Sequence, residues 1–179
     1  MTHRRSGALL IIIGLALIGL VAVWRFYQST VLSFKYTPDQ LPPATSLGSP
    51  PVAIDIDRIN LHLAVTPATV TNGIWEISPT GASHWRNSAN PGTPGNIVIY
   101  GHNKISLFGP IRWLEIGDTI TLTAASGQTF TYTVTQSLVV NPDQVAYIQP
   151  TDTTTLTLYT CTGFLDRQRH IIIARPVAD

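Results

Sequence analysis

The 179-residue chain is poor in cysteine and in charge, and each shortage excludes a class of protein. It holds one cysteine, Cys161, so it can form neither an intramolecular disulfide nor a cysteine-rich zinc site. Charged residues make up 12% of the chain and the formal net charge is +1, whereas nucleic-acid-binding proteins carry a strongly basic surface. With 44% hydrophobic residues, the chain is also too apolar to be disordered. The composition favours a folded protein that does not bind nucleic acid.

One long hydrophobic run stands at the N-terminus. Residues 8–24 contain no charge, and a helix of that length nearly crosses the hydrocarbon core of a membrane, which is about 30 Å thick. Arg4 and Arg5 precede the run, and by the positive-inside rule they keep the N-terminus in the cytoplasm while the rest is exported. We therefore expect residues 1–25 to form a cytoplasmic basic stub and a transmembrane signal anchor in contact with membrane lipid. The protein would then be a single-pass protein of the cell membrane.

Two other interpretations of this run fit less well. A cleaved signal peptide needs small residues at its cleavage site, whereas Trp24-Arg25-Phe26-Tyr27 follows the run here. A helix packed against the core of a protein this small would keep one polar face towards solvent, whereas this run is apolar on every face.

The rest of the chain divides into a linker and one exported domain. Residues 26–51 contain five prolines, which is typical of a stalk and an extended linker. Residues 52–179 show no internal repeat and no long amphipathic helical pattern. They hold short segments rich in Thr, Val, Ile and Tyr, at 52–57, 59–65, 96–102, 118–124, 128–137, 153–161 and 170–176. Such segments, separated by Gly, Pro and Asn, predict an all-β closed barrel or sandwich, with one helical turn at 106–114.

Three residues with reactive side chains stand at the ends of predicted strands. Cys161 ends one strand, His102 ends another, and Arg169 begins the last. A cysteine of this kind is most often a small buried apolar side chain. Strand ends, however, are where side chains become accessible and where catalysis is commonly placed. A thiolate could attack a carbonyl there, while an imidazolium protonates the leaving amine and a guanidinium stabilises the oxyanion.

At these residues the chain resembles the sortase family, the membrane-anchored cysteine transpeptidases of bacterial surfaces. The segment Thr155-Leu156-Thr157-Leu158-Tyr159-Thr160-Cys161 resembles the TLxTC strand of the family. The segment Arg169-His170-Ile171-Ile172-Ile173-Ala174 is similar to its final strand, which an arginine begins. Residues 96–103 (NIVIYGHN) match its histidine strand, and Trp85 with residues 91–96 resembles the approach to that strand. The likeness spans residues 52–176.

The resemblance implies both a fold and a mechanism. The fold is an eight-stranded β-barrel with one or two short helical turns. Cys161 would be the nucleophile, His102 the general acid and base, and Arg169 the cation that holds the oxyanion or the substrate. The family cleaves an LPxTG-like sorting signal between Thr and Gly and holds the Thr carbonyl as a thioester. It then transfers that carbonyl to an amine on a peptidoglycan precursor or on another protein, so the implied partners are surface proteins with such signals. No cofactor is implied.

Other roles for the charged and metal-binding residues have less support. Arg167 lies two residues before Arg169 and competes with it for the role of the cation. His62, His84 and His170 could join His102 at a metal, but they lack metal-ligand spacing. Calcium, which some sortases bind through clustered acids, is little supported because the acidic residues are spread out, at Asp55, Asp57, Asp143, Asp152 and Asp166.

Other functions remain open. One is a hydrolytic cysteine peptidase, and another is a non-catalytic tethered β-domain for adhesion or scaffolding, in which the thiol would be buried and inert. The L,D-transpeptidases match less well, because their cysteine lies in a Ser-x-Gly-Cys-x-Arg loop, unlike Thr160-Cys161-Thr162. Pilus-building sortases commonly have a C-terminal membrane helix and an N-terminal lid with an acidic-proline-aromatic motif. This chain ends soon after its last predicted strand, and its linker has only Pro38-Asp39-Gln40. We therefore expect a protein-anchoring enzyme rather than a pilin polymerase.

Overall fold

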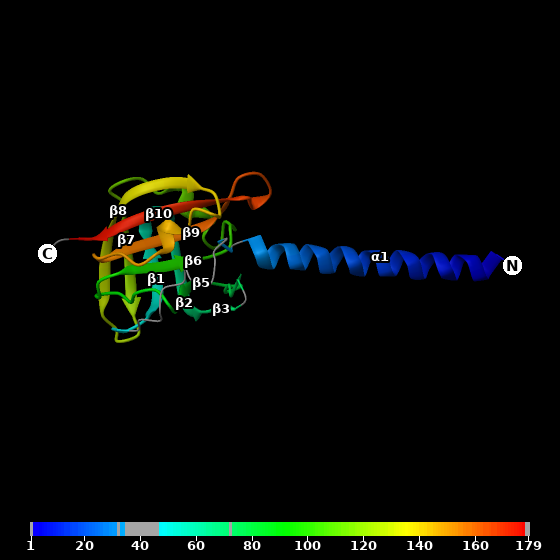
Figure 1. The fold of residues 1–179 in the computed structure, drawn as a ribbon, viewed down its shortest axis with the longest axis horizontal. Coiled ribbons are helices and arrows are strands. Elements are labelled where there is room, and N and C mark those ends of the chain that lie inside the picture. The colour runs from blue at the N-terminus through cyan, green and yellow to red at the C-terminus, as the bar shows by residue number, and fades with distance from the viewer. Residues whose placement is uncertain (1, 32, 35–46, 72, 178–179) are drawn as a thin grey trace. The chain divides into compact units, whose positions relative to one another are not determined.

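The structure is a computed structural model that describes residues 2–31, 33–34, 47–71 and 73–177 (Figure 1). It forms two compact units, Met1–Val31 and Leu32–Asp179. Much of the linker that we predicted over residues 26–51, including the Pro38-Asp39-Gln40 segment, lies outside the described residues.

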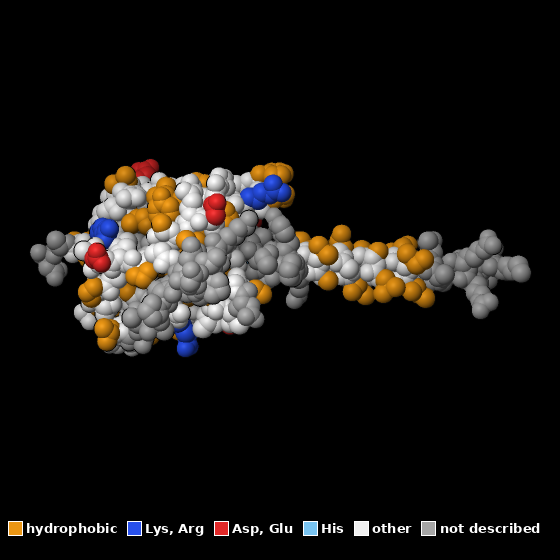
Figure 2. Space-filling model, viewed as in Figure 1, with side chains coloured by type: hydrophobic (Ala, Val, Ile, Leu, Met, Phe, Trp, Pro, Cys, Tyr) orange, Lys and Arg blue, Asp and Glu red, His pale blue; other side chains and the backbone are white. Residues whose placement is uncertain are grey.

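The first unit is a single helix, α1 (Thr2–Val31), which continues past Arg25 into the segment predicted as a stalk. Apolar side chains from Leu10 to Trp24 are exposed along it, as Figure 2 shows. Among the described residues, no helix is long and apolar enough to cross a membrane. The predicted helix is thus confirmed, whereas the predicted membrane-spanning anchor over residues 1–25 is not.

The second unit is a closed barrel of eight strands, which confirms the fold that the resemblance implied. Around the barrel the strands follow the order β1-β2-β5-β6-β9-β10-β8-β7, and β7 pairs with β1 to close it. The strands are β1 (Pro51–Ile56), β2 (Leu61–Ala68), β5 (Ala82–Trp85), β6 (Asn96–Tyr100), β7 (Thr119–Ala124), β8 (Thr129–Val140), β9 (Thr155–Thr162) and β10 (Gln168–Pro176).

The strands form where apolar residues alternate with polar ones or follow one another in short runs. In a strand, every second side chain points to the same face, so one set from each strand fills the barrel. The buried core contains such sets as Ile97 and Ile99 from β6, Leu156 and Leu158 from β9, and Ile172 from β10. On β6 and β9 the residues of the other set are buried as well, because further segments cover the outer face there.

The structure differs from the sequence-based expectation in its shortest elements. Strand β5 was not predicted, because its sequence Ala-Ser-His-Trp has neither β-branched residues nor alternation. The two-stranded sheet of β3 (Val70–Thr71) and β4 (Ile74–Trp75) was also missed. The helical turn predicted at residues 106–114 is the 3₁₀ helix η3 (Gly109–Trp113). The other 3₁₀ helices of the described chain are η2 (Asp57–Ile59), η4 (Val145–Ile148) and η5 (Phe164–Asp166).

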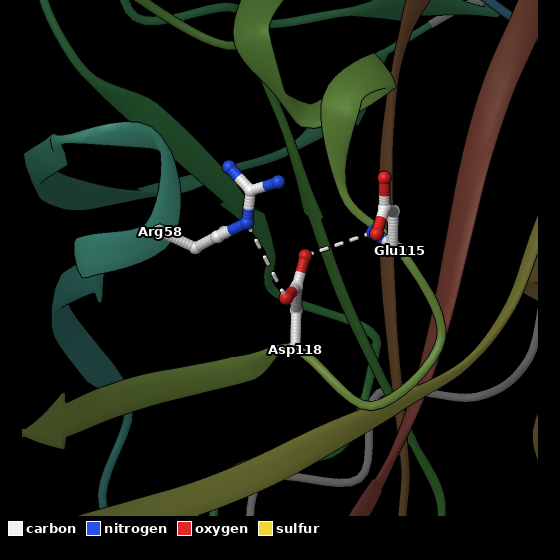
Figure 3. A network of polar contacts seen from close by, with 3 residues as sticks. All are labelled: Arg58, Glu115 and Asp118. Atoms are coloured by element: carbon white, nitrogen blue, oxygen red, sulfur yellow. Dashed lines mark hydrogen bonds and ion pairs between the residues drawn. The ribbon is translucent and has the colours of Figure 1, made fainter.

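A polar network fastens the turn before β7 (Figure 3). One carboxylate oxygen of Asp118 accepts a hydrogen bond from the backbone N–H of Glu115 at 2.8 Å. The other lies 3.9 Å from Nε of Arg58, on the neighbouring η2. Gly117 between them has φ +100, a conformation that other residues rarely adopt. Because the Arg58 side chain is largely exposed, the ion pair contributes at most about 1 kcal/mol, and the turn itself depends on the Asp118 bond and the glycine.

Candidate active site

The three predicted site residues come from three strands that lie side by side in the barrel (Figure 1). Strand β6 runs parallel to β9, with Tyr100 opposite Tyr159. Strand β10 runs antiparallel to β9, with Arg169 directly opposite Cys161. His102 follows Tyr100 by two residues, as Cys161 follows Tyr159. The structure therefore brings Cys161, His102 and Arg169 to the same end of one three-stranded segment.

Backbone and side-chain bonds hold the loop that carries His102. The N–H of Gly101 donates to the carbonyl of Tyr159 at 3.3 Å, and Thr160 Oγ1 donates to the carbonyl of Gly101 at 2.8 Å. The carbonyl of His102 accepts from the N–H groups of Lys104, at 2.8 Å, and Phe108, at 3.1 Å. Both the approach to His102 and the turn after it are thus fixed to β9 and to η3.

The thiol of Cys161 is buried, with 3% of the residue exposed. Burial raises its pKa to about 12; the nearby Arg169 cation opposes this rise, and the Asp166 carboxylate adds to it. The side chain is therefore a neutral thiol at neutral pH. This is the state that the non-catalytic interpretation expects, so burial alone does not identify a nucleophile.

The imidazole of His102 is half-buried, and its pKa is lowered from the ordinary value near 6.5. Burial is the main cause, and the positive charge of Lys104 adds to it. A raised thiol pKa and a lowered imidazole pKa both favour the neutral pair. The thiolate–imidazolium pair is thus a minor form of the resting site.

The guanidinium of Arg169 is buried, with only 2% of the residue exposed. Its Nη1 donates to the backbone carbonyls of Asp166, at 3.0 Å, and Gln168, at 2.9 Å. Its Nη2 donates to the carbonyl of Ser33 at 2.7 Å, and its Cζ lies 6.0 Å from the centre of the Phe34 ring. Arg167, the competing cation, is exposed. The buried cation opposite Cys161 is therefore Arg169.

The loop between β9 and β10 connects the cysteine strand to the histidine loop. The side-chain amide of Asn103 donates to the carboxylate of Asp166 at 3.2 Å. Leu165 and Asp166 have φ near +55, an uncommon conformation for residues other than glycine. The contact between Asn103 and Asp166 was not predicted, because it joins segments 63 residues apart.

An aromatic cluster lines the outer face of the barrel beside the site. Tyr100 and Tyr159 stack with ring centres 5.1 Å apart. Trp75 from β4 meets both tyrosines edge-on, and Phe34 meets Tyr159 edge-on at 5.0 Å. Only 2% of Phe34 is exposed. Phe34 was predicted to lie in the stalk, in a stretch that could extend the anchor helix, and no local pattern there predicted its contact with Tyr159.

The other histidines of the barrel domain lie in separate settings. His84 is buried, with Nε2 3.0 Å from the carbonyl of Ala89, and burial lowers its pKa to about 4. His62 lies on the surface 2.9 Å from Asp55, and His170 lies 3.1 Å from the hydroxyl of Ser137. Within the described part of the chain, no three His, Cys, Asp or Glu side chains gather as metal ligands would.

Comparisons with known proteins identify the family of the barrel domain. The family model of the sortase domain matches residues 54–177. Sortase A of Listeria monocytogenes is 30% identical over 137 residues, which are 72% of this chain and 61% of that protein. The chain therefore spans about three fifths of the length of this curated relative.

Solved structures of the same family have the same fold. Sortase A from Corynebacterium diphtheriae superposes with a TM-score of 0.63 at 26% identity, covering 89% of this chain and 83% of that one. A sortase D5 transpeptidase from Clostridium perfringens superposes with a TM-score of 0.62 at 26% identity, covering 74% of this chain and 82% of that one. Sortase C1 from Streptococcus agalactiae superposes with a TM-score of 0.61 at 25% identity, covering 71% of this chain and 67% of that one. The sortase domain matches most of the chain, and the barrel carries a cysteine, a histidine and an arginine at the ends of neighbouring strands. The chain therefore belongs to the sortase family.

Proposed function

We propose that the chain is a cysteine transpeptidase that cleaves an LPxTG-like sorting signal between Thr and Gly and joins the Thr carbonyl to an amine. The observation that carries this proposal is the register of β9 and β10, which sets Arg169 opposite Cys161, with His102 at the end of the neighbouring β6. A thiol can serve as the nucleophile, an imidazole as the acid and base, and a buried guanidinium as the oxyanion stabiliser of acyl transfer through a thioester.

The reaction begins with a proton transfer. The Cys161 proton passes to His102, and the thiolate attacks the carbonyl carbon of the substrate Thr. The bond from that carbon to the Gly nitrogen breaks, and the His102 imidazolium gives its proton to the leaving amine. A thioester between Cys161 and the Thr carbonyl remains. The acceptor amine attacks this thioester, His102 takes the proton of the amine, and the Cys161 thiolate leaves.

Arg169 would hold the substrate carbonyl as its oxygen becomes negative. A buried guanidinium interacts strongly with such an oxygen, since little water screens it. The hydrogen bond from Nη2 to the carbonyl of Ser33 supports this role, because a peptide carbonyl already lies on the guanidinium.

The partners would be surface proteins with a C-terminal sorting signal and an amine on a peptidoglycan precursor or another protein. The products would be proteins attached to the cell wall, so the domain would lie outside the cytoplasm. Sortases as a family are membrane-anchored enzymes of the outer surface, and that membership supports the placement. We propose that the enzyme belongs to the protein-anchoring sortases rather than to the pilin polymerases.

A peptide panel tests this function. The full chain is incubated with fluorogenic LPxTG and LAxTG peptides, each with and without an acceptor that begins with glycine. We expect cleavage of at least one peptide and a ligated product when the acceptor is present. Cleavage with no ligated product would make the protein a hydrolytic cysteine peptidase. No cleavage of any peptide would support a non-catalytic β-domain.

The role of Arg169 is tested against that of Arg167. Loss of an oxyanion donor typically lowers kcat about 10²–10³-fold, and a lysine cannot reproduce the planar fork of a guanidinium. We expect Arg169→Lys and Arg169→Ala both to lower kcat strongly, with the alanine variant worse. Arg167→Ala removes an exposed charge and should change kcat by less than about tenfold, near 1.4 kcal/mol.

Stability must be measured beside these rates, because Arg169 also bonds the carbonyls of Asp166 and Gln168. Rates are therefore taken at a temperature where each variant is folded by circular dichroism. A crippled Arg167→Ala beside a healthy Arg169→Ala would move the cation role to Arg167.

A further inference from the structure

Buried polar atoms without a hydrogen-bond partner gather around Phe34. Among the described residues they include Oγ of Ser33, Oη of Tyr159 and Nε of Arg169. More than nine in ten buried polar groups in proteins are hydrogen-bonded, and each unpaired one is costly. Ser33 adjoins Phe34, Tyr159 meets its ring edge, and Arg169 lies beside the ring. Unpaired polar atoms at one place, next to a proposed nucleophile, point to a place built for a polar ligand.

The position of Tyr159 relates it to the reacting groups. It lies two residues before Cys161 on β9, so both side chains point to the same face of the strand. Arg169 stands opposite Cys161 on β10. Tyr159 is fully buried, stacked on Tyr100 and covered by Phe34. A peptide that lies on Cys161 and Arg169 would pass over this ring.

Ser33 and Phe34 show what kind of ligand fits there. The carbonyl of Ser33 accepts a hydrogen bond from Arg169, and the side chain of Phe34 packs on Tyr159. A peptide backbone with an apolar side chain is therefore accommodated. This segment nevertheless leaves the hydroxyl of Tyr159 without a partner.

We infer that Tyr159 is a substrate-binding residue: when a sorting-signal peptide displaces Ser33 and Phe34, the Tyr159 hydroxyl donates a hydrogen bond to a backbone carbonyl of the peptide. This inference rests on the proposed function. The hydroxyl is available as a donor at every assay pH, because burial raises the pKa of Tyr159 well above its usual value. The neighbouring Tyr100 cannot take this role, since its hydroxyl already donates to the carbonyl of Glu76 at 2.6 Å.

The two stacked tyrosines provide a matched pair of variants. Tyr159→Phe removes a hydroxyl that has no partner in the resting protein, so its melting temperature should equal or exceed that of the wild type. Its kcat/KM for the best peptide should fall about tenfold, mainly through KM, since the lost bond forms only with substrate. Tyr100→Phe leaves the carbonyl of Glu76 unpaired, so it should melt at a lower temperature and change kcat/KM less than about threefold.

A third variant tests the displacement itself. Phe34→Ala removes the ring that the peptide must displace and should lower KM, because a larger fraction of the protein is then able to bind. In the Phe34→Ala background, Tyr159→Phe should still lower kcat/KM about tenfold. The pH profile of kcat/KM should be the same with and without the Tyr159 hydroxyl, since that group does not titrate with Cys161 and His102.

The outcomes separate this inference from the proposed function. If the wild-type chain cleaves no peptide, the proposed function fails and the role of Tyr159 falls with it. If the wild type is active and Tyr159→Phe has the same kcat/KM, this inference alone is overturned. A fall in the melting temperature of Tyr159→Phe like that of Tyr100→Phe would also overturn it, because the hydroxyl would then serve the fold.

Discussion

Replacing Cys161 with alanine is expected to abolish peptide cleavage and ligation, with a loss on the order of 10⁴-fold or more in kcat. The thiol is the only strong nucleophile among the side chains that the structure brings to the ends of β6, β9 and β10. Without it, no thioester forms, and the remaining groups can only bind the peptide. Initial rates with the best peptide of the panel, with and without acceptor, measure the effect.

The stability of the same variant distinguishes a nucleophile from a buried structural thiol. Cys161 is 3% exposed, so its sulfur could also serve only to fill the interior. If the site exists for catalysis, Cys161→Ala should unfold in urea at nearly the same free energy as the wild type. A loss of about 2–4 kcal/mol would indicate a core cavity and support the non-catalytic domain. Turnover by Cys161→Ala at the wild-type rate would end the assignment.

Replacing His102 with alanine is expected to lower kcat/KM by about 10²–10⁴-fold, the usual contribution of a positioned acid and base. His102 is the imidazole at the end of β6, fixed there by the bonds of Gly101 and by the turn to Phe108. Without it, the Gly amine must leave unprotonated, and the thiol must lose its proton to water.

The pH dependence follows from the two perturbed groups. The reactive form carries one proton on the pair, located on His102 and not on Cys161. Its concentration rises as pH rises through the lower pKa of the pair and falls above the upper one. Because the pKa of His102 is lowered from 6.5 and that of Cys161 is raised to about 12, the profile of kcat/KM should be a broad bell. Its acid limb should lie below pH 6.5 and its alkaline limb above pH 9.

The kcat/KM profile of His102→Ala should lack the acid limb that belongs to His102, and kcat/KM should only rise with pH as the thiol loses its proton. His170→Gln provides the control, because His170 is also half-buried and its pKa is also lowered, chiefly by burial. Its bell should keep both limbs. A wild-type profile without two limbs, or a His102→Ala protein with the wild-type rate, would contradict the acid–base role.

The strands and the reactive residues at their ends are largely readable from the sequence. Runs and alternations of apolar residues are local properties, so β6, β9 and β10 could be located within a few residues of their observed bounds. Cys161, His102 and Arg169 were identified because each stands where such a segment begins or ends. Strand β5 has no such pattern; its burial depends on its neighbours β2 and β6.

Only the tertiary structure decided which groups meet and in what state. The parallel register of β6 and β9 joins segments far apart in the chain, and no local pattern encodes it. The bond between Arg169 and Ser33 spans 136 residues. Tyr100 and Tyr159 are both tyrosines in apolar strand segments, and the sequence does not distinguish them. In the structure the Tyr100 hydroxyl has a hydrogen-bond partner, whereas the Tyr159 hydroxyl has none. The sequence by itself determined the pattern of strands and the residue types at their ends, because both depend on neighbouring residues in the chain. The burial of the site side chains, their pKa values and their hydrogen-bond partners depend on contacts that exist only once the barrel closes.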